Sequence, residues 1–69
     1  WAGDTVPPVH PVIGYRIDHV QGPTDTVLTA ILRDGVPVAP SADVVIEGGD
    51  ELFFITTLDG EDQIRALFA

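Results

Sequence analysis

The chain has 69 residues, which is enough for one small domain, and a chain of this length buries only about 60% of the surface that its unfolded form exposes. It contains no cysteine, which excludes disulfides and thiolate metal sites, and its net charge of −8 disfavours nucleic acid and anionic lipid as partners. Hydrophobic residues make up 45% of the chain, as in globular domains, but no apolar run approaches the roughly 20 residues of a membrane span.

The first nine residues are rich in proline. Pro7 and Pro8 lack a backbone donor and favour an extended conformation, so residues 1–9 are expected to form an edge strand or a proline-rich lead. The chain does not begin with Met, and we expect it to be a piece of a longer protein.

A short helix is predicted next. Ile13, Ile17 and Val20 recur at helical spacing over about two turns. Gly14 is unfavourable inside a helix, so the helix is expected to begin at or just after it. The sequence QGP at 21–23 is a typical stop signal, because Gly suits the left-handed exit and Pro cannot continue the helix.

A strand and a hairpin follow. Residues 25–33, DTVLTAILR, are apolar on both alternating faces, which favours a central strand covered on each side. Asp34-Gly35 predicts a two-residue hairpin turn, because glycine tolerates positive φ. VPVAP at 36–40 is expected to return as the partner strand, and its two prolines confine it to an edge.

The last part of the chain predicts a strand and a helix. SADVV at 41–45 is expected to hold a turn and a short strand or 3₁₀ turn, and EGGDE at 47–51 a tight reversal. LFFIT at 52–56 reads as the last strand. The final helix is expected to be capped by Asp59 and to bury Ile64, Leu67 and Phe68.

The order β-α-β-β-β-α predicts an α+β domain with a mostly antiparallel sheet and two short helices. So small a core, with neither disulfide nor metal to support it, favours self-association, and we expect a dimer.

The sequence carries no catalytic constellation, and we expect no enzyme activity. Ser41 is the only serine and no histidine lies near it in sequence. Arg33 is expected to pair with Asp34 or with an acid across the turn, whereas Arg16 and Arg65 are expected to be exposed.

Four acids could in principle hold a hard cation. Their spacing does not match an EF-hand loop, and two of them are expected to bond to turn backbone instead. We therefore predict no metal site, with a divalent cation kept as an open alternative. The four acids are Asp43, Glu47, Asp50 and Glu51.

The ordered set of motifs resembles the TrkA-C, or RCK-C, domain, which is the C-terminal regulatory domain of potassium-transport regulators. That family shows Pro-apolar-apolar-Gly, a short helix, a strand ending in Arg-x-Gly, a second strand, Pro-x-x-Asp, Gly-Asp and a last strand. The matching positions here are 11–14, 17–20, 31–35, 40–43, 49–50 and 52–55. The resemblance covers about residues 10–68, so we assign 10–69 to such a domain, whereas the proline-rich start departs from the family's first strand.

The resemblance implies a regulatory role in the cytoplasm. Such domains dimerise on the inner face of the plasma membrane, attached through a channel, a Trk or Ktr uptake system or an antiporter. A ligand biases the dimer arrangement and thereby gates transport of potassium or another monovalent cation, without covalent chemistry. Two alternatives stay open, namely a purely structural oligomerisation module and the same module in a transcription regulator or an anion carrier.

The resemblance also suggests a ligand, because some relatives bind cyclic di-AMP at the two-fold axis between two copies. The corresponding contacts lie at the end of the first helix and the following loop, in the next strand, and at the proline of Pro-x-x-Asp. These positions are His19, Val20, Gln21, Val27, Leu28 and Pro40. The ligand is a dianion, whereas the loop VQGPTDT has no basic residue, and His19 could contribute a charge only when protonated. Otherwise His19 is a surface residue of the first helix.

Overall fold

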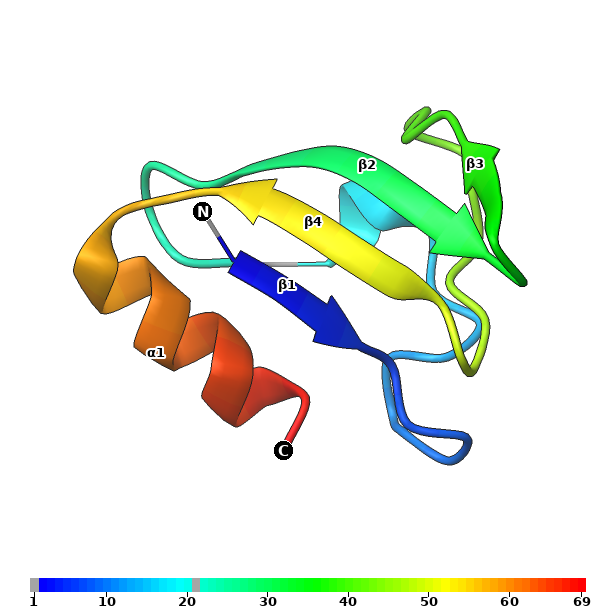
Figure 1. Ribbon diagram of the computed structural model, residues 1–69, viewed down its shortest axis with the longest axis horizontal. Helices are drawn as coiled ribbons and strands as arrows, with labels where there is room; N and C mark the ends of the chain where they lie inside the picture. The colour runs from blue at the N-terminus through cyan, green and yellow to red at the C-terminus, as the bar shows by residue number, and fades with distance from the viewer. Residues whose placement is uncertain (1, 21) are drawn as a thin grey trace.

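Four strands form one antiparallel sheet in the computed structural model, which describes residues 2–20 and 22–69 and leaves Trp1 and Gln21 outside the description. The strands are β1 (Ala2–Thr5), β2 (Val27–Arg33), β3 (Val36–Val38) and β4 (Glu51–Ile55). A 3₁₀ helix, η1 (Ile17–His19), precedes β2, and an α-helix, α1 (Leu58–Leu67), follows β4. The strand order is β1-β4-β2-β3, with each neighbouring pair antiparallel (Figure 1). The α+β class and the antiparallel sheet are thus confirmed.

The hairpin between β2 and β3 forms where the sequence predicts it. Asp34 has φ 52° and Gly35 has φ 75°, so both central residues are left-handed, as a type I′ turn requires. The turn pairs Arg33 with Val36 and places β3 at the edge of the sheet, where Pro37 is exposed. β1 forms the opposite edge.

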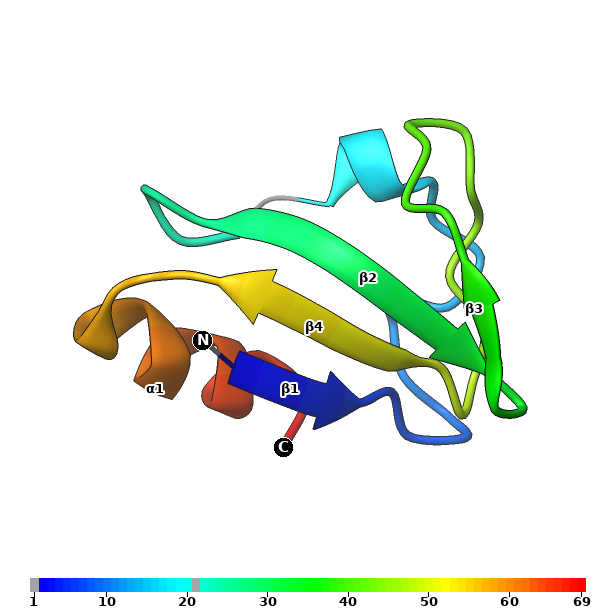
Figure 2. The same ribbon diagram turned by 45° about the horizontal axis from the view of Figure 1, so that its top comes forward.

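β2 lies inside the sheet, as expected, but only one of its faces is covered. Ile31 is buried on the inner face, whereas Ala30 is exposed and Val27 is 61% exposed on the outer face. The expectation of cover on both sides is therefore wrong for a single copy. Figures 1 and 2 show the reason, which is that α1 and η1 lie on the same side of the sheet.

A β-bulge interrupts β2. The pairing with β4 shifts register between Leu28 and Ala30, so Thr29 is an extra residue on β2. The Thr29 hydroxyl donates a hydrogen bond to the carbonyl of Phe53 at 3.0 Å. This bond anchors the bulge to β4.

The core lies between the inner face of the sheet and a second layer made of α1, η1 and irregular segments. Seven hydrophobic side chains of the described chain are buried there. They are Val6, Val12, Ile31, Ile46, Leu52, Ile64 and Phe68.

The predicted first helix is wrong in kind, because the chain forms only the single 3₁₀ turn of η1. Gly14 N donates to Ile46 O at 2.9 Å, and Ile46 N donates to Tyr15 O at 3.0 Å. Ile17 N donates to Val44 O at 2.8 Å, so residues 14–17 pair with 44–46 like a short ribbon. Tertiary pairing of the backbone overrides the helical periodicity of the apolar side chains.

The predicted cap and part of the predicted stripe of α1 are also wrong. Thr57, not Asp59, is the N-cap, and its hydroxyl accepts a hydrogen bond from Gly60 N at 3.1 Å. Asp59 lies in the first turn instead. Ile64 and Phe68 are buried, but Leu67 is 40% exposed.

A buried ion pair joins the sheet to the second layer. Arg33 at the end of β2 donates from Nε and Nη2 to the two carboxylate oxygens of Asp50, each at 2.9 Å. The same guanidinium donates to Val45 O at 2.9 Å and lies 2.8 Å from a carboxylate oxygen of Glu47. Asp50 is only 1% exposed, and it also accepts a hydrogen bond from Glu47 N at 2.9 Å.

The pair shifts the pKa of both partners. Burial by itself raises the pKa of Asp50, but the hydrogen bonds from Arg33 and Glu47 N and the arginine charge outweigh it, so the pKa lies below its ordinary value. The hydrogen bond to Asp50 raises the pKa of Arg33. Because the folded-state pKa of Asp50 is depressed, its stabilisation is present above the unfolded pKa of about 3.9 and is lost as pH falls through the folded-state pKa.

Replacing Asp50 by Asn should therefore flatten the acid limb of the stability curve. We expect urea unfolding of the wild type to lose free energy more steeply than Asp50→Asn as pH falls below about 4. Asp43→Asn at an exposed turn is the control and should follow the wild type. Parallel curves for wild type and Asp50→Asn would contradict a stabilising charge at Asp50.

The assignment of the helix cap predicts a difference between two neighbouring substitutions. Thr57→Ala should lower the free energy of unfolding by about 1 kcal/mol, because Gly60 N loses its acceptor. Asp59→Ala should cost only about 0.3–0.5 kcal/mol, through the lost interaction with the helix dipole. Urea denaturation of both variants measures the two losses of unfolding free energy. A larger loss for Asp59→Ala than for Thr57→Ala would indicate that Asp59 is the cap.

Candidate functional site

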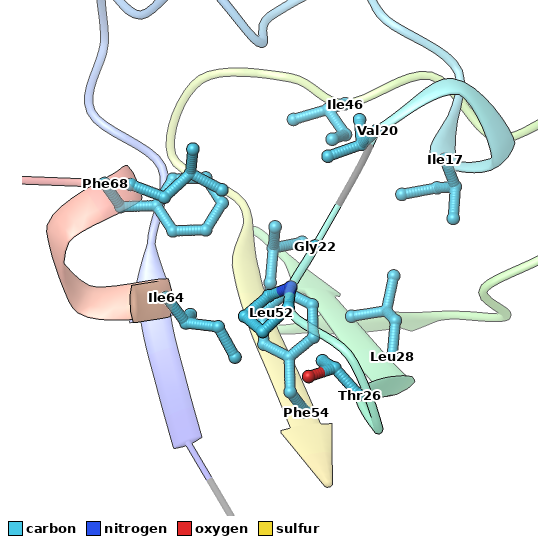
Figure 3. A pocket seen from close by; sticks show the side chains of 12 residues that line it. Ile17, Val20, Gly22, Thr26, Leu28, Ile46, Leu52, Phe54, Ile64 and Phe68 are labelled. Carbon is cyan, nitrogen blue, oxygen red and sulfur yellow. The ribbon is translucent and has the colours of Figure 1, made fainter. Parts of the chain in front are cut away.

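An apolar crevice of about 220 Å³ lies on the inner face of the sheet, between α1 and the segment that joins η1 to β2. Leu52 and Phe54 of β4 lie at its centre in Figure 3. One wall carries Ile64 and Phe68 from the end of the chain, and the opposite wall carries side chains of η1 and β2 (Figure 3). The full lining is Ile17, Val20, Gly22, Pro23, Thr26, Leu28, Ile46, Leu52, Phe54, Ile64, Leu67 and Phe68.

The lining of the apolar crevice carries no charged side chain among the described residues. Its one hydroxyl, Thr26 Oγ1, is 2.8 Å from Thr56 Oγ1, so the two hydroxyls share a hydrogen bond. Apolar walls with a single hydroxyl suit an uncharged group, because a buried charge without a partner costs several kcal/mol.

The structure brings only part of the predicted ligand residues to the apolar crevice. Val20 and Leu28 line it. His19 and Pro40 do not, and Val27 lies on the opposite face of β2, opposite Ile55. Gln21 lies outside the described residues. The roles of these six residues in binding stay predictions.

The acids nearest in sequence to His19 are Asp18 on η1 and Asp25 in the turn before β2. The Asp18 carboxylate accepts a hydrogen bond from Arg16 at 2.9 Å, and its other oxygen lies 3.8 Å from the exposed ring of His19. Asp25, with φ 58°, adds another carboxylate to the turn that leads into β2. Arg16, the basic residue nearest to His19 in sequence, is therefore already engaged by an acid.

Two of the four acids considered for a cation, Glu47 and Asp50, form ion pairs with Arg33. Arg33 thus pairs with acids, as expected, but they lie in the segment 45–50 rather than at the β2–β3 turn. No group of three or more His, Asp or Glu residues among positions 2–20 and 22–69 has a geometry that could hold a metal ion. In the same part of the chain, neither helix has the length and apolar character needed to cross a bilayer.

Sequence reasoning did not identify the apolar crevice as a site. Ile64 and Phe68 are predicted as the buried stripe of the last helix, and both are indeed buried. Periodicity shows which side chains turn inward, but it does not show that two walls stay apart. That separation depends on where the segment 22–26 lies over the sheet, which is a tertiary property.

Comparisons with known proteins agree on one family. The model of the TrkA-C domain matches residues 3–69. The Trk system potassium uptake protein TrkA of Mycobacterium tuberculosis, in strains CDC 1551 / Oshkosh and H37Rv, is 36% identical over 63 residues. That match covers 91% of this chain, and the chain spans 29% of the length of these relatives.

Two solved structures share the fold. The RCK_C domain dimer of S. agalactiae BusR in complex with c-di-AMP is 26% identical, with a TM-score of 0.81 over 96% of this chain and 91% of that one. An RCK domain with cda is 13% identical, with a TM-score of 0.82 over the whole of both chains, which shows the fold alone. Since the family model covers nearly the whole chain, the chain belongs to the TrkA-C domain family.

Proposed function

We propose that this domain senses a small ligand and, as a dimer, regulates potassium transport from the cytoplasmic side of the membrane. The observation that carries the proposal is the match to TrkA, a potassium uptake protein, at 36% identity over 91% of this chain. The mechanism needs no covalent step, because a ligand that prefers one dimer arrangement shifts the equilibrium between arrangements. The transporter that responds is a channel, a Trk or Ktr uptake system or an antiporter.

A dimer is supported by the uncovered outer face of the sheet. Val27 and Ile55 pair across β2 and β4 on this face and are 61% and 57% exposed. Ala30 and Phe53 form the next pair along the two strands. Apolar side chains grouped on an uncovered sheet face favour burial against a partner. The BusR domain at 26% identity is itself a dimer.

Sedimentation velocity at micromolar concentration tests the dimer, with two matched valines as variants. The wild type should sediment as a dimer, and Val27→Asp should weaken it by about tenfold or more, because a carboxylate would be buried at the interface. Val36 is equally exposed, at 61%, but begins β3 on the far side of the hairpin, paired with Arg33, so Val36→Asp should leave the dimer intact.

Two outcomes would contradict the dimer proposal. A stable, folded wild-type monomer at micromolar concentration would show that the small core does not need a second copy for its stability. Equal weakening by both aspartates would show that added negative charge, rather than the position of Val27, governs association.

We propose cyclic di-AMP as the first ligand to test, at the two-fold axis between two copies, with His19, Val20, Gln21, Val27, Leu28 and Pro40 as the candidate contact residues. The BusR domain, which carries c-di-AMP, supports the choice. Asp18 beside His19 and Asp25 in the turn before β2 oppose a dianion, so the exposed ring of His19 is proposed to donate a hydrogen bond to a phosphate.

Calorimetry tests this ligand. Cyclic di-AMP should give a saturable heat, and His19→Glu should weaken binding by about tenfold or more, because a carboxylate at this position would repel the phosphates. AMP serves as the control nucleotide. If neither cyclic di-AMP, AMP nor a divalent cation gives heat or a melting shift, the domain is a structural oligomerisation module without a sensed ligand.

A further inference from the structure

The apolar crevice is larger than the gaps that close packing leaves in a small core. Folded interiors contain few voids bigger than a water molecule, because side chains interdigitate. Here a space of about 220 Å³, partly open to solvent, reaches in to the buried side chains of Ile46, Leu52 and Ile64. Of the residues proposed above for the dinucleotide, Val20 and Leu28 line the crevice.

We propose that the apolar crevice is a binding site for a small uncharged molecule, of the size of one substituted ring. An apolar cavity of about 150 Å³ stays dry and accepts benzene, so about 220 Å³ leaves room for a ring with a short substituent. Among the described residues, the lining has no charged side chain to pair with an ionised guest. A neutral guest that is apolar over most of its surface therefore matches both the volume and the chemistry.

A route into the apolar crevice is also present. A second, shallower depression is lined by Gly22, Pro23, Gln63 and Leu67, and three of these residues also line the crevice. Gly22 has no side chain to block the passage. Leu67 is 40% exposed at this rim although it was predicted to be buried, so the same residue faces both the crevice and solvent.

This binding site does not depend on the dimer or on potassium transport, because a single copy of the chain supplies every lining residue described. It shares β2 with the proposed dimer surface, since Leu28 faces the crevice while its neighbour Val27 faces the outer side of the sheet. Binding in the crevice can therefore be measured separately from association of two copies.

Methyl NMR of the 69-residue chain with toluene as the probe tests the proposal. Toluene should shift the methyl signals of Val20, Leu28 and Ile64 in a saturable way, and benzoate, the same ring with a charge, should not. Leu28→Phe fills the crevice and should weaken toluene binding by about tenfold or more. Leu32→Phe is the matched control, because Leu32 lies on the same strand but pairs with Glu51 on the outer face, and it should bind like the wild type.

The proposal is overturned if the wild type shows no saturable shift, if benzoate binds as well as toluene, or if Leu28→Phe binds toluene unchanged. Should Leu28→Phe fail to fold, the positions of the methyl signals that toluene shifts in the wild type test the proposal. Shifts at the lining methyls support the site, and shifts confined to Val27 and Ile55 on the outer face overturn it. Sedimentation of the same sample reports the dimer independently, so failure of one proposal is distinguished from failure of the other.

Discussion

The ion pair between Arg33 and Asp50 is the interaction on which the two layers of this domain depend. Arg33 ends β2, and Asp50 directly precedes β4 with its carboxylate almost fully buried. The backbone of the same residue also holds the start of the chain. Val6 N donates to the carbonyl oxygen of Asp50, and Gly49 N donates to the carbonyl oxygen of Val6, each at 2.8 Å. Removing the arginine would leave a buried carboxylate without its charge partner, which is among the costlier defects in a protein interior.

The same pair explains why two distant motifs occur together in the sequence. Arg-x-Gly supplies Arg33 and the glycine of the type I′ turn, and Gly-Asp supplies the left-handed Gly49 and the buried Asp50. In the fold, the guanidinium reaches from the first motif to the second and also binds Val45 O between them. The motifs therefore specify one junction between the sheet and the segment 45–50.

Features governed by local chemistry were predictable from the sequence, and features governed by tertiary contacts were not. Asp34-Gly35 fixes its hairpin through backbone conformation alone, and the strands predicted at 25–33 and 52–56 form as β2 and β4 in the expected order. Ile17 and Val20 keep helical spacing, yet the backbone of 14–17 bonds to 44–46 and leaves only η1. Thr57, rather than Asp59, is the N-cap of α1, because the chain leaving β4 brings the Thr57 hydroxyl within hydrogen-bond distance of Gly60 N.

The single covered face of the sheet gives the domain two different apolar surfaces. The inner face holds the core and the apolar crevice, and the outer face presents Val27 and Ile55 to solvent in a single copy. Adjacent residues of β2, Val27 and Leu28, belong to the two surfaces, and the bulge at Thr29 follows them. A partner on one face and a guest on the other would thus contact neighbouring residues of the same strand.

A double-mutant cycle on Arg33→Met and Asp50→Asn, followed by urea unfolding at fixed protein concentration, tests the central claim most directly. If the pair holds the layers together, Arg33→Met leaves the buried Asp50 carboxylate without its charge partner, Asp50→Asn removes the charge that Arg33 binds, and the double variant loses less than the sum of the two. We predict an interaction free energy of about 1–3 kcal/mol. Additive losses, with an interaction below about 0.5 kcal/mol, would contradict the account.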